Sequence, residues 1–179
     1  HTVSGSGSGD GVVINGYSGV TVRNLTVRGF VRGFYLASTN TDVLTENNAT
    51  GNTYGIYLNT QTTDVQLLRN TASNNNHGIF LYYANANVLD GNTAENNRYH
   101  GIHIERCGSH TLTGNTAAGN EDGFYFLVSH DNRLTGNTAR DNRGYGIRLE
   151  SCMYNTLDGN IMERNRFDFR VEGSTDGQY

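Results

Sequence analysis

Residues 132–149 read NRLTGNTARDNRGYGIRL, and the closing phrase Gly146-Ile147-Arg148-Leu149 returns along almost the whole chain. The other copies are Gly11-Val12-Val13-Ile14, Gly33-Phe34-Tyr35-Leu36, Gly55-Ile56-Tyr57-Leu58, Gly78-Ile79-Phe80-Leu81, Gly101-Ile102-His103-Ile104, Gly123-Phe124-Tyr125-Phe126 and the degenerate Asp168-Phe169-Arg170-Val171. Successive copies start 22 or 23 residues apart. A regular period of this length indicates a solenoid, in which each unit packs on the next.

Within each copy the apolar residues alternate with other residues, which is the pattern of a β-strand and not of a helix. The strand is short and is followed by a turn of Asn, Gly, Thr or Asp residues. A coil of this length cannot pair with itself, so its strands must pair with the coils above and below. The sequence therefore predicts an all-β fold, a right-handed parallel β-helix of about eight coils. We expect one domain over residues 1–179, as part of a longer chain.

A second phrase, Asn-Thr-Ala, runs in phase with the first and predicts an asparagine ladder. Its Asn positions are Asn70, Asn92, Asn115 and Asn137, and Asn24, Asn47 and Asn160 are assigned to the same slot. A further polar column is read as Asp42, Asp64, Asn87, His110, Asn132 and Asn155. Buried turns leave backbone groups without strand partners, and an Asn side chain can bond them and the Asn one coil away, at about 4.8 Å. Asn also tolerates the left-handed conformation of sharp turns.

Composition excludes two classes of function. The net charge is −4 and all 13 basic residues are Arg, so nothing favours a nucleic-acid partner. No apolar run approaches the roughly 18 residues of a membrane span. Cys107 and Cys152 occupy the same slot two coils apart, about 2 × 4.8 Å, which is too far for a disulfide. We expect both to be buried thiols that fill space.

One face of the solenoid is unusual for an exposed sheet. If the residues one and three after the repeat Gly point inward, those two and four after it point outward. The slot two after Gly holds Tyr35, Tyr57, Phe80, His103, Tyr125, Arg148 and Arg170. The slot four after Gly holds Ala37, Asn59, Tyr82, Glu105, Leu127, Glu150 and Glu172. The slot before Gly holds Arg32, Tyr54, His77, His100, Asp122, Tyr145 and Phe167.

This face favours binding of an acidic polysaccharide, because aromatic rings stack on sugar rings and Arg pairs with uronate or sulfate groups. The expected substrate-binding residues are Tyr35, Tyr57, Phe80, Tyr82, Arg106, Glu150 and Arg170. The expected catalytic residues of a lyase or uronate C5-epimerase are His103, Tyr125, Arg148, His100, Tyr145 and Glu105. Arg148 would neutralise the uronate carboxylate, His103 or Tyr125 would remove the C5 proton, and Tyr145 or His100 would return one.

Two other interpretations stay open. Aromatic side chains that stack coil on coil stabilise a solenoid without any ligand, so the chain can be a non-catalytic structural or interaction protein of a surface or filament. The histidines also allow a periplasmic metal-handling protein, since His77, His100 and Asp122 share a column, and His100, His103 and Glu105 share a coil. No cofactor is expected, with calcium or a His-bound metal as the alternative.

The run 132–149 and its repeats, from about Gly11 to Val171, resemble the parallel β-helix repeat family. That family includes mannuronan C-5 epimerases, polysaccharide lyases and periplasmic accessory proteins of nitrous-oxide reductase. The resemblance implies this fold and an extracellular or periplasmic location. The epimerases carry a Tyr-Gly-Phe-Asp-Pro-His type motif, and its nearest matches are Tyr54-Gly55-Ile56-Tyr57-Leu58-Asn59 and Tyr145-Gly146-Ile147-Arg148-Leu149-Glu150, which share only the Tyr and Gly.

Neither end of the sequence shows a cap over the open coil. His1-Thr2-Val3 enters the pattern at once, and only Glu172 to Tyr179 follow the last copy. Unpaired strand edges associate readily, so natural solenoids cover them. We therefore expect the chain to extend before His1 or to self-associate through its uncapped ends.

Overall fold

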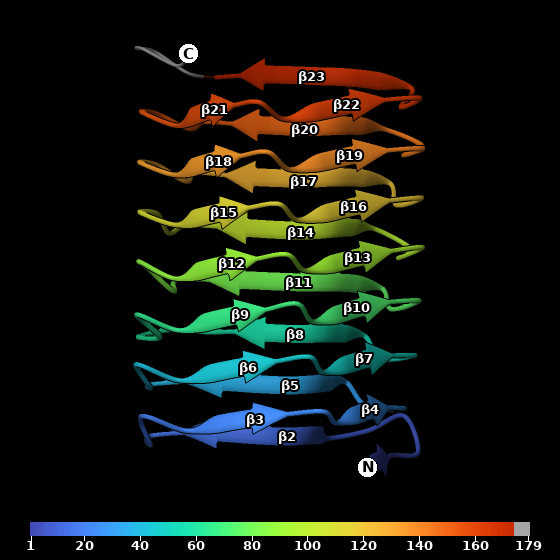
Figure 1. The fold of residues 1–179 in the computed structure, drawn as a ribbon, viewed down its shortest axis with the longest axis vertical. Coiled ribbons are helices and arrows are strands. Elements are labelled where there is room, and N and C mark those ends of the chain that lie inside the picture. Colours follow the sequence, from blue (N-terminus) through green and yellow to red (C-terminus); the bar gives the residue numbers. More distant parts are fainter. Residues whose placement is uncertain (174–179) are drawn as a thin grey trace.

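The protein is a stack of β-coils in the computed structural model, which describes residues 1–173. Figure 1 shows the coils lying one above another, with the N-terminal coil at one end and the C-terminal coil at the other. Each full coil contributes one strand to each of three parallel sheets. The part of the chain that the structure describes contains no helix long and apolar enough to cross a membrane. The predicted parallel β-helix of about eight coils is confirmed.

Two of the sheets consist of three-residue strands. One contains β1 (Thr2–Ser4), β4 (Thr26–Arg28), β7 (Asn48–Thr50), β10 (Thr71–Ser73), β13 (Thr93–Glu95), β16 (Thr116–Ala118), β19 (Thr138–Arg140) and β22 (Ile161–Glu163). The other contains β3 (Thr21–Arg23), β6 (Val43–Thr45), β9 (Gln66–Leu68), β12 (Val88–Asp90), β15 (Thr111–Thr113), β18 (Arg133–Thr135) and β21 (Thr156–Asp158).

The remaining sheet, called here the long-strand sheet, contains the strands of the repeated Gly phrase. Its strands are β2 (Asp10–Asn15), β5 (Arg32–Ala37), β8 (Tyr54–Leu58), β11 (His77–Tyr82), β14 (His100–Glu105), β17 (Asp122–Leu127), β20 (Tyr145–Glu150) and β23 (Phe167–Glu172). Equivalent residues of successive copies are register partners, as Ile102 is of Ile79 and of Phe124. The inward residues of all three sheets form one narrow core, which extends through the stack from Ile14 to Cys152.

The repeat Gly allows the turn before each long strand to approach the strand closely. A Cβ at Gly101 would lie 2.7 Å from Nδ2 of Asn120 and 2.8 Å from the carbonyl oxygen of Gly123. A side chain at this position therefore could not be accommodated without displacing the next coil. This contact explains why a Gly begins the phrase in seven consecutive coils.

The asparagine ladder is present and fully buried in the central coils. Asn115 is representative, because its Oδ1 accepts from the backbone N–H and the Nδ2 of Asn92, both at 2.9 Å. Its own Nδ2 donates to the carbonyl of Leu89 at 2.8 Å and to Oδ1 of Asn137 at 2.9 Å. One side chain thus satisfies backbone groups of two different segments of the coil below and continues the ladder above.

Two assignments to the columns were wrong by one residue. The first-coil slot of the ladder is Leu25, whose N–H donates to Oδ1 of Asn47, and not Asn24. The slot of the second column in the third coil is Val65, whose N–H donates to Asn87, and not Asp64. Asn24 and Asp64 precede these slots and have positive φ angles of 55° and 54°. The left-handed residue is therefore the one before the ladder, and the ladder Asn residues do not supply that conformation.

A third ladder was missed by the sequence interpretation. It consists of Asn52, Asn75, Asn97, Asn120, Asn142 and Asn165, linked by the same pattern of bonds. In each coil the three ladder positions are five residues apart. Asn87 of the second column is followed by Asn92 of the first ladder and then by Asn97 of the third. This constant spacing of five residues would have predicted the third ladder from the sequence.

The two cysteines agree with expectation. Cys107 and Cys152 are buried in the core, two coils apart, as thiols. Burial raises the pKa of both, and that of Cys107 reaches about 12. Both therefore stay protonated near neutral pH and act as small apolar fillers. The expectation about the C-terminal end falls partly on residues 174–179, which lie outside the described residues.

Candidate functional site

The outer face of the long-strand sheet has the predicted orientation of side chains. Phe124 and Phe126 are fully buried, whereas Tyr125 between them points outward and is partly exposed. Phe80 and His103 also point outward, yet each is only 8% exposed. Neighbouring rings cover them, because register partners in adjacent strands stand side by side.

The rings form a continuous stack across several coils. In the slot two after Gly, the ring centroids of Tyr57 and Phe80 lie 5.1 Å apart, those of Phe80 and His103 4.5 Å, and those of His103 and Tyr125 4.8 Å. The slot before Gly adds a parallel row, in which Tyr54 and His77 stack at 5.1 Å. Such pairs stabilise the sheet by themselves, and the same surface offers apolar ring faces to a ligand.

Burial keeps three of these histidines neutral. It is the main cause that lowers the pKa of His77 and of His100 to about 4 and that of His103 to about 2. The nearby imidazoles lower the pKa of His77 and His103 further, and Arg148 lowers that of His100. Within the described residues, Nδ1 of His77, Nδ1 of His100 and both ring nitrogens of His103 are buried without a hydrogen-bond partner.

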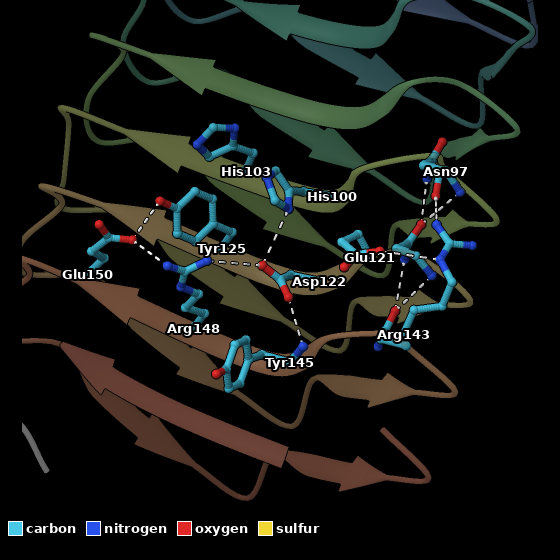
Figure 2. Close-up of polar contacts among 12 residues, drawn as sticks. Asn97, His100, His103, Glu121, Asp122, Tyr125, Arg143, Tyr145, Arg148 and Glu150 are labelled. Atoms are coloured by element: carbon cyan, nitrogen blue, oxygen red, sulfur yellow. Dashed lines mark hydrogen bonds and ion pairs between the residues drawn. The ribbon is translucent and has the colours of Figure 1, made fainter. Parts of the chain in front are cut away.

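Asp122 lies at the centre of the polar residues beside this stack (Figure 2). Its side chain accepts the backbone N–H of Tyr145 at 2.7 Å, and its other oxygen lies 3.6 Å from Nδ1 of His100 and 3.8 Å from Nη1 of Arg148. Asp122 is 4% exposed, and burial raises the pKa of its carboxyl. Since His100 is neutral, the contact between them is polar and is not an ion pair.

Arg148 is surrounded by acidic groups. Its Nη2 lies 2.9 Å from Glu150 and 3.3 Å from Glu172, in addition to the contact with Asp122. The same Glu150 oxygen accepts the Tyr125 hydroxyl at 2.9 Å, and the guanidinium lies 5.0 Å from the centre of the Tyr125 ring. Burial and then Glu150 raise the pKa of Tyr125, so its hydroxyl stays protonated. We call His100, His103, Asp122, Tyr125, Arg148 and Glu150 the polar cluster.

The other expected residues lie around this cluster. Glu105 is 3.7 Å from Nε2 of His103, and Tyr145 accepts a hydrogen bond from Arg170. Arg170 also pairs with Glu172. Tyr35 and Tyr57 lie at the far end of the ring stack, with their ring centroids 5.7 Å apart.

Arg106 points mainly toward the neighbouring corner, although its Nε lies 3.5 Å from Oε1 of Glu105 on the face. It is bonded to the Tyr83 hydroxyl at 3.1 Å and lines a separate cavity at the corner that follows the long strand. Its left-handed backbone, with a φ of 55°, turns the chain away from the sheet. Tyr82 contacts Tyr83 edge-on at 4.6 Å and so lies at the border between face and corner.

Sequence reasoning missed the central position of Asp122 and the contact of Glu172 with Arg148. Both residues stand in the outward slots, so the signal was their place in the repeat. It also missed Arg143, which bonds the carbonyl of Arg98 at 2.9 Å and lies 3.4 Å from Glu121 (Figure 2). Arg143 reaches across two coils at the opposite corner, a contact that no repeat position encodes.

The fold and this face define a class of protein, the parallel β-helix with a titratable cluster on its outer long-strand face. More narrowly, the chain belongs to the family described as periplasmic copper-binding protein (NosD), whose model matches residues 1–179. A comparison with curated proteins found no match.

Solved structures of alginate-modifying enzymes share the fold. The A-module of the Azotobacter vinelandii mannuronan C-5 epimerase AlgE4 superposes with a TM-score of 0.85 at 15% identity, over 98% of this chain and 56% of that one. A double mutant of the periplasmic alginate epimerase AlgG gives 0.82 at 19% identity, over 90% of this chain and 44% of that one. The chain thus spans about half the length of these structures, and identities this low show the fold alone.

The family description raises the question of copper. Imidazoles are suitable copper ligands, and the unpartnered nitrogens of His77, His100 and His103 are the natural candidates. Residues 1–173, however, contain no group of three or more His, Cys, Asp or Glu side chains placed to hold a metal ion. The side chains as arranged do not fit a metal centre.

Proposed function

We propose that the chain is an extracytoplasmic protein that binds a uronate-containing polysaccharide along the outer face of the long-strand sheet. On this proposal it removes the proton at C5 of one uronate, as a lyase or a C5-epimerase does. The observation that carries the proposal is the register of His103, Tyr125 and Arg148, which stand in one column on three consecutive strands. A base, a proton donor and a cation are thereby placed about 4.8 Å apart from coil to coil.

The protonation states suggest a role for each group. His103 is neutral, so its one unprotonated ring nitrogen can accept a proton, and a uronate beside it would raise its low pKa. Both nitrogens are buried in the free protein, so this role requires the bound polymer to displace the rings that cover them. Tyr125 stays protonated, so it donates a proton and does not act as the base. Arg148 pairs with the uronate carboxylate and makes the C5 proton more acidic. His100 and Tyr145 flank the column and are the other candidates to return a proton.

Removal of the C5 proton is the first step of both the lyase and the epimerase reaction. His103 takes the C5 proton, and the electron pair of the C–H bond moves into the carboxylate-stabilised carbanion. In a lyase this pair forms a C4–C5 double bond, the C4–oxygen bond breaks, and Tyr125 protonates the leaving oxygen. In an epimerase the carbanion takes a proton on its opposite face, from Tyr145 or His100. The names of the structural neighbours, mannuronan and alginate epimerases, support uronates as the substrate class.

The rate of turnover should depend on the residues of the column His103, Tyr125 and Arg148, and not on tyrosines elsewhere. We expect His103→Gln and Tyr125→Phe to lower the rate by about 10²–10⁴-fold, the usual contribution of acid–base groups. The assay follows ultraviolet absorbance of the new double bond with alginate or pectate, and C5–H exchange in D₂O by NMR. Tyr17→Phe, at an exposed tyrosine away from the face, is the control. If the parent protein neither binds nor turns over these polymers, the chain is a structural or interaction solenoid instead.

Glu150 was expected to bind substrate, but beside Arg148 it should oppose the binding of an acidic polymer, because it competes with the uronate for that arginine. We expect Glu150→Gln to tighten binding by about 3- to 10-fold, which corresponds to roughly 1 kcal/mol. Isothermal titration calorimetry with oligouronates measures the effect. Glu46→Gln is a matched control, since Glu46 also pairs with an arginine, Arg69 at 3.3 Å, but lies outside the face. Equal or weaker binding by Glu150→Gln would argue against a uronate at Arg148.

A further inference from the structure

A second, separate hollow lies at the corner that follows the long strands. It is an open hollow of about 460 Å³ that spans three coils. The cavity is lined by Tyr83, Asn85, Arg106, Cys107, Gly108, Ser109, Val128, His130 and Asp131. Its size lies within the range of small-molecule pockets, about 300–1,000 Å³.

Gly108 lines the hollow and allows the turns beside it to stack tightly. Gly108 pairs with His130 in the next coil, and its N–H donates to Oδ1 of Asn85 in the previous one at 2.9 Å. It thus occupies the position at which those coils carry an Asn and a His. A Cβ at Gly108 would lie 2.1 Å from the carbonyl oxygen of His130, so the tight stacking of these turns keeps the position a glycine.

The lining groups offer both donors and acceptors. Nδ1 of His130 accepts the backbone N–H of Met153 at 3.0 Å, so a neutral His130 carries its proton on Nε2. Arg106 and the Asn85 amide add donors, the Asp131 carboxylate is an acceptor, and the Ser109 hydroxyl is both. Arg106 and Asp131 bring one positive and one negative charge, which favours an uncharged ligand over an anion.

The aromatic wall completes the ligand chemistry. Tyr83 is 41% exposed and stands edge-on to Tyr82, the last residue of β11. Its hydroxyl is held by Arg106 at 3.1 Å, which fixes the ring beside the hollow. Sugar hydroxyls both donate and accept, and the C–H face of a pyranose ring packs on aromatic rings. We propose that this corner cavity binds a neutral pyranose, as a site distinct from the polar cluster.

NMR titration of the whole chain with methyl glycosides of glucose, mannose and galactose tests this site. We expect at least one of them to shift the backbone amides of Gly108, Ser109 and Asp131 in a saturable manner. Tyr83→Ala and Asp131→Asn should each weaken that binding at least fivefold. Tyr154→Ala is the matched control, because Tyr154 is also exposed and also has a positive φ, 56°, but does not line the cavity.

Variants at the two sites distinguish pyranose binding at the corner from uronate binding at the long-strand face. Tyr83→Ala should leave uronate binding at the long-strand face unchanged, and Arg148→Ala should leave pyranose binding at the corner unchanged. Saturable shifts with glucuronate or inorganic sulfate but with no neutral glycoside would overturn the proposal in favour of an anion site. No saturable shift with any neutral glycoside, or equal losses in Tyr83→Ala and Tyr154→Ala, would also overturn it.

Discussion

The protein should lose several kcal/mol of unfolding free energy when the pH falls from 6.5 to about 4. Four histidines, His77, His100, His103 and His110, have pKa values lowered from 6.5 to about 4 or below, with burial as the main cause. In the unfolded chain they take up protons near pH 6.5, whereas in the folded chain they do not. Acid therefore favours the unfolded state, and the full contribution to stability is present only above pH 6.5. Each pKa unit corresponds to about 1.4 kcal/mol.

His110 provides the sharpest variant for this prediction. It stands in a column between Asn87 and Asn132, its Nδ1 accepts the N–H of Asn87 at 3.1 Å, and its buried Nε2 has no partner among the described residues. In His110→Asn, the amide oxygen would accept the same N–H, as Asn residues do elsewhere in the column. We expect this variant to retain its stability at neutral pH and to lose less of it in acid.

Urea unfolding at a series of pH values measures the effect. Below pH 6.5, the slope of unfolding free energy against pH should fall by up to about 1.4 kcal/mol per pH unit in His110→Asn, since one fewer proton is taken up on unfolding. The exposed His1 supplies the control, because His1→Gln leaves the number of buried imidazoles unchanged. A His110→Asn slope equal to that of the parent would show that His110 does not carry this linkage.

Removing one ladder residue should cost about 2–5 kcal/mol. Asn115→Ala deletes a side chain that makes four hydrogen bonds and leaves the N–H of Asn92 and the carbonyl of Leu89 buried without a partner. Each buried polar group left unsatisfied costs about 1–3 kcal/mol. The methyl group of Ala cannot replace these bonds, and the buried turn leaves little room for water.

Asn48→Ala is the matched control for the ladder. Asn48 directly follows the ladder residue Asn47, yet it is exposed at the start of β7. Its replacement should change stability by no more than about 0.5 kcal/mol. Thermal and urea unfolding of both variants give the comparison. A loss for Asn115→Ala as small as that for Asn48→Ala would mean that the ladder bonds contribute little net stability.

The fold could be predicted because every coil repeats the same local signals, whereas exact alignment of the coils could not. Coils have 22 or 23 residues, and the extra residue does not always fall in the same turn. In the third coil it lies between Gly55 and Val65, where other coils have one residue fewer, which is why Asp64 was taken for the slot of Val65. Backbone hydrogen bonds show which residue occupies the slot, whereas the spacing of the glycines does not.

The residues of the site were predictable, but their partners were not. Alternation along a strand placed His103, Tyr125 and Arg148 on the outer face. The environment of Arg148 depends on three side chains from its own strand and the two neighbouring ones, Asp122, Glu150 and Glu172. Arg106 points mainly toward the corner because its backbone is left-handed, a conformation that one sequence position does not reveal.

The ladders make each coil interchangeable with its neighbours as a structural part. A coil presents the same amide oxygens to the coil below and the same N–H groups to the coil above, at positions such as Asn87, Asn92 and Asn97. Duplication or loss of one 22- or 23-residue coil in the central part of the stack would therefore leave most of the remaining junctions with compatible partners. Proteins of this kind can lengthen by whole coils, and the outward side chains of a new copy are free to diverge toward another ligand.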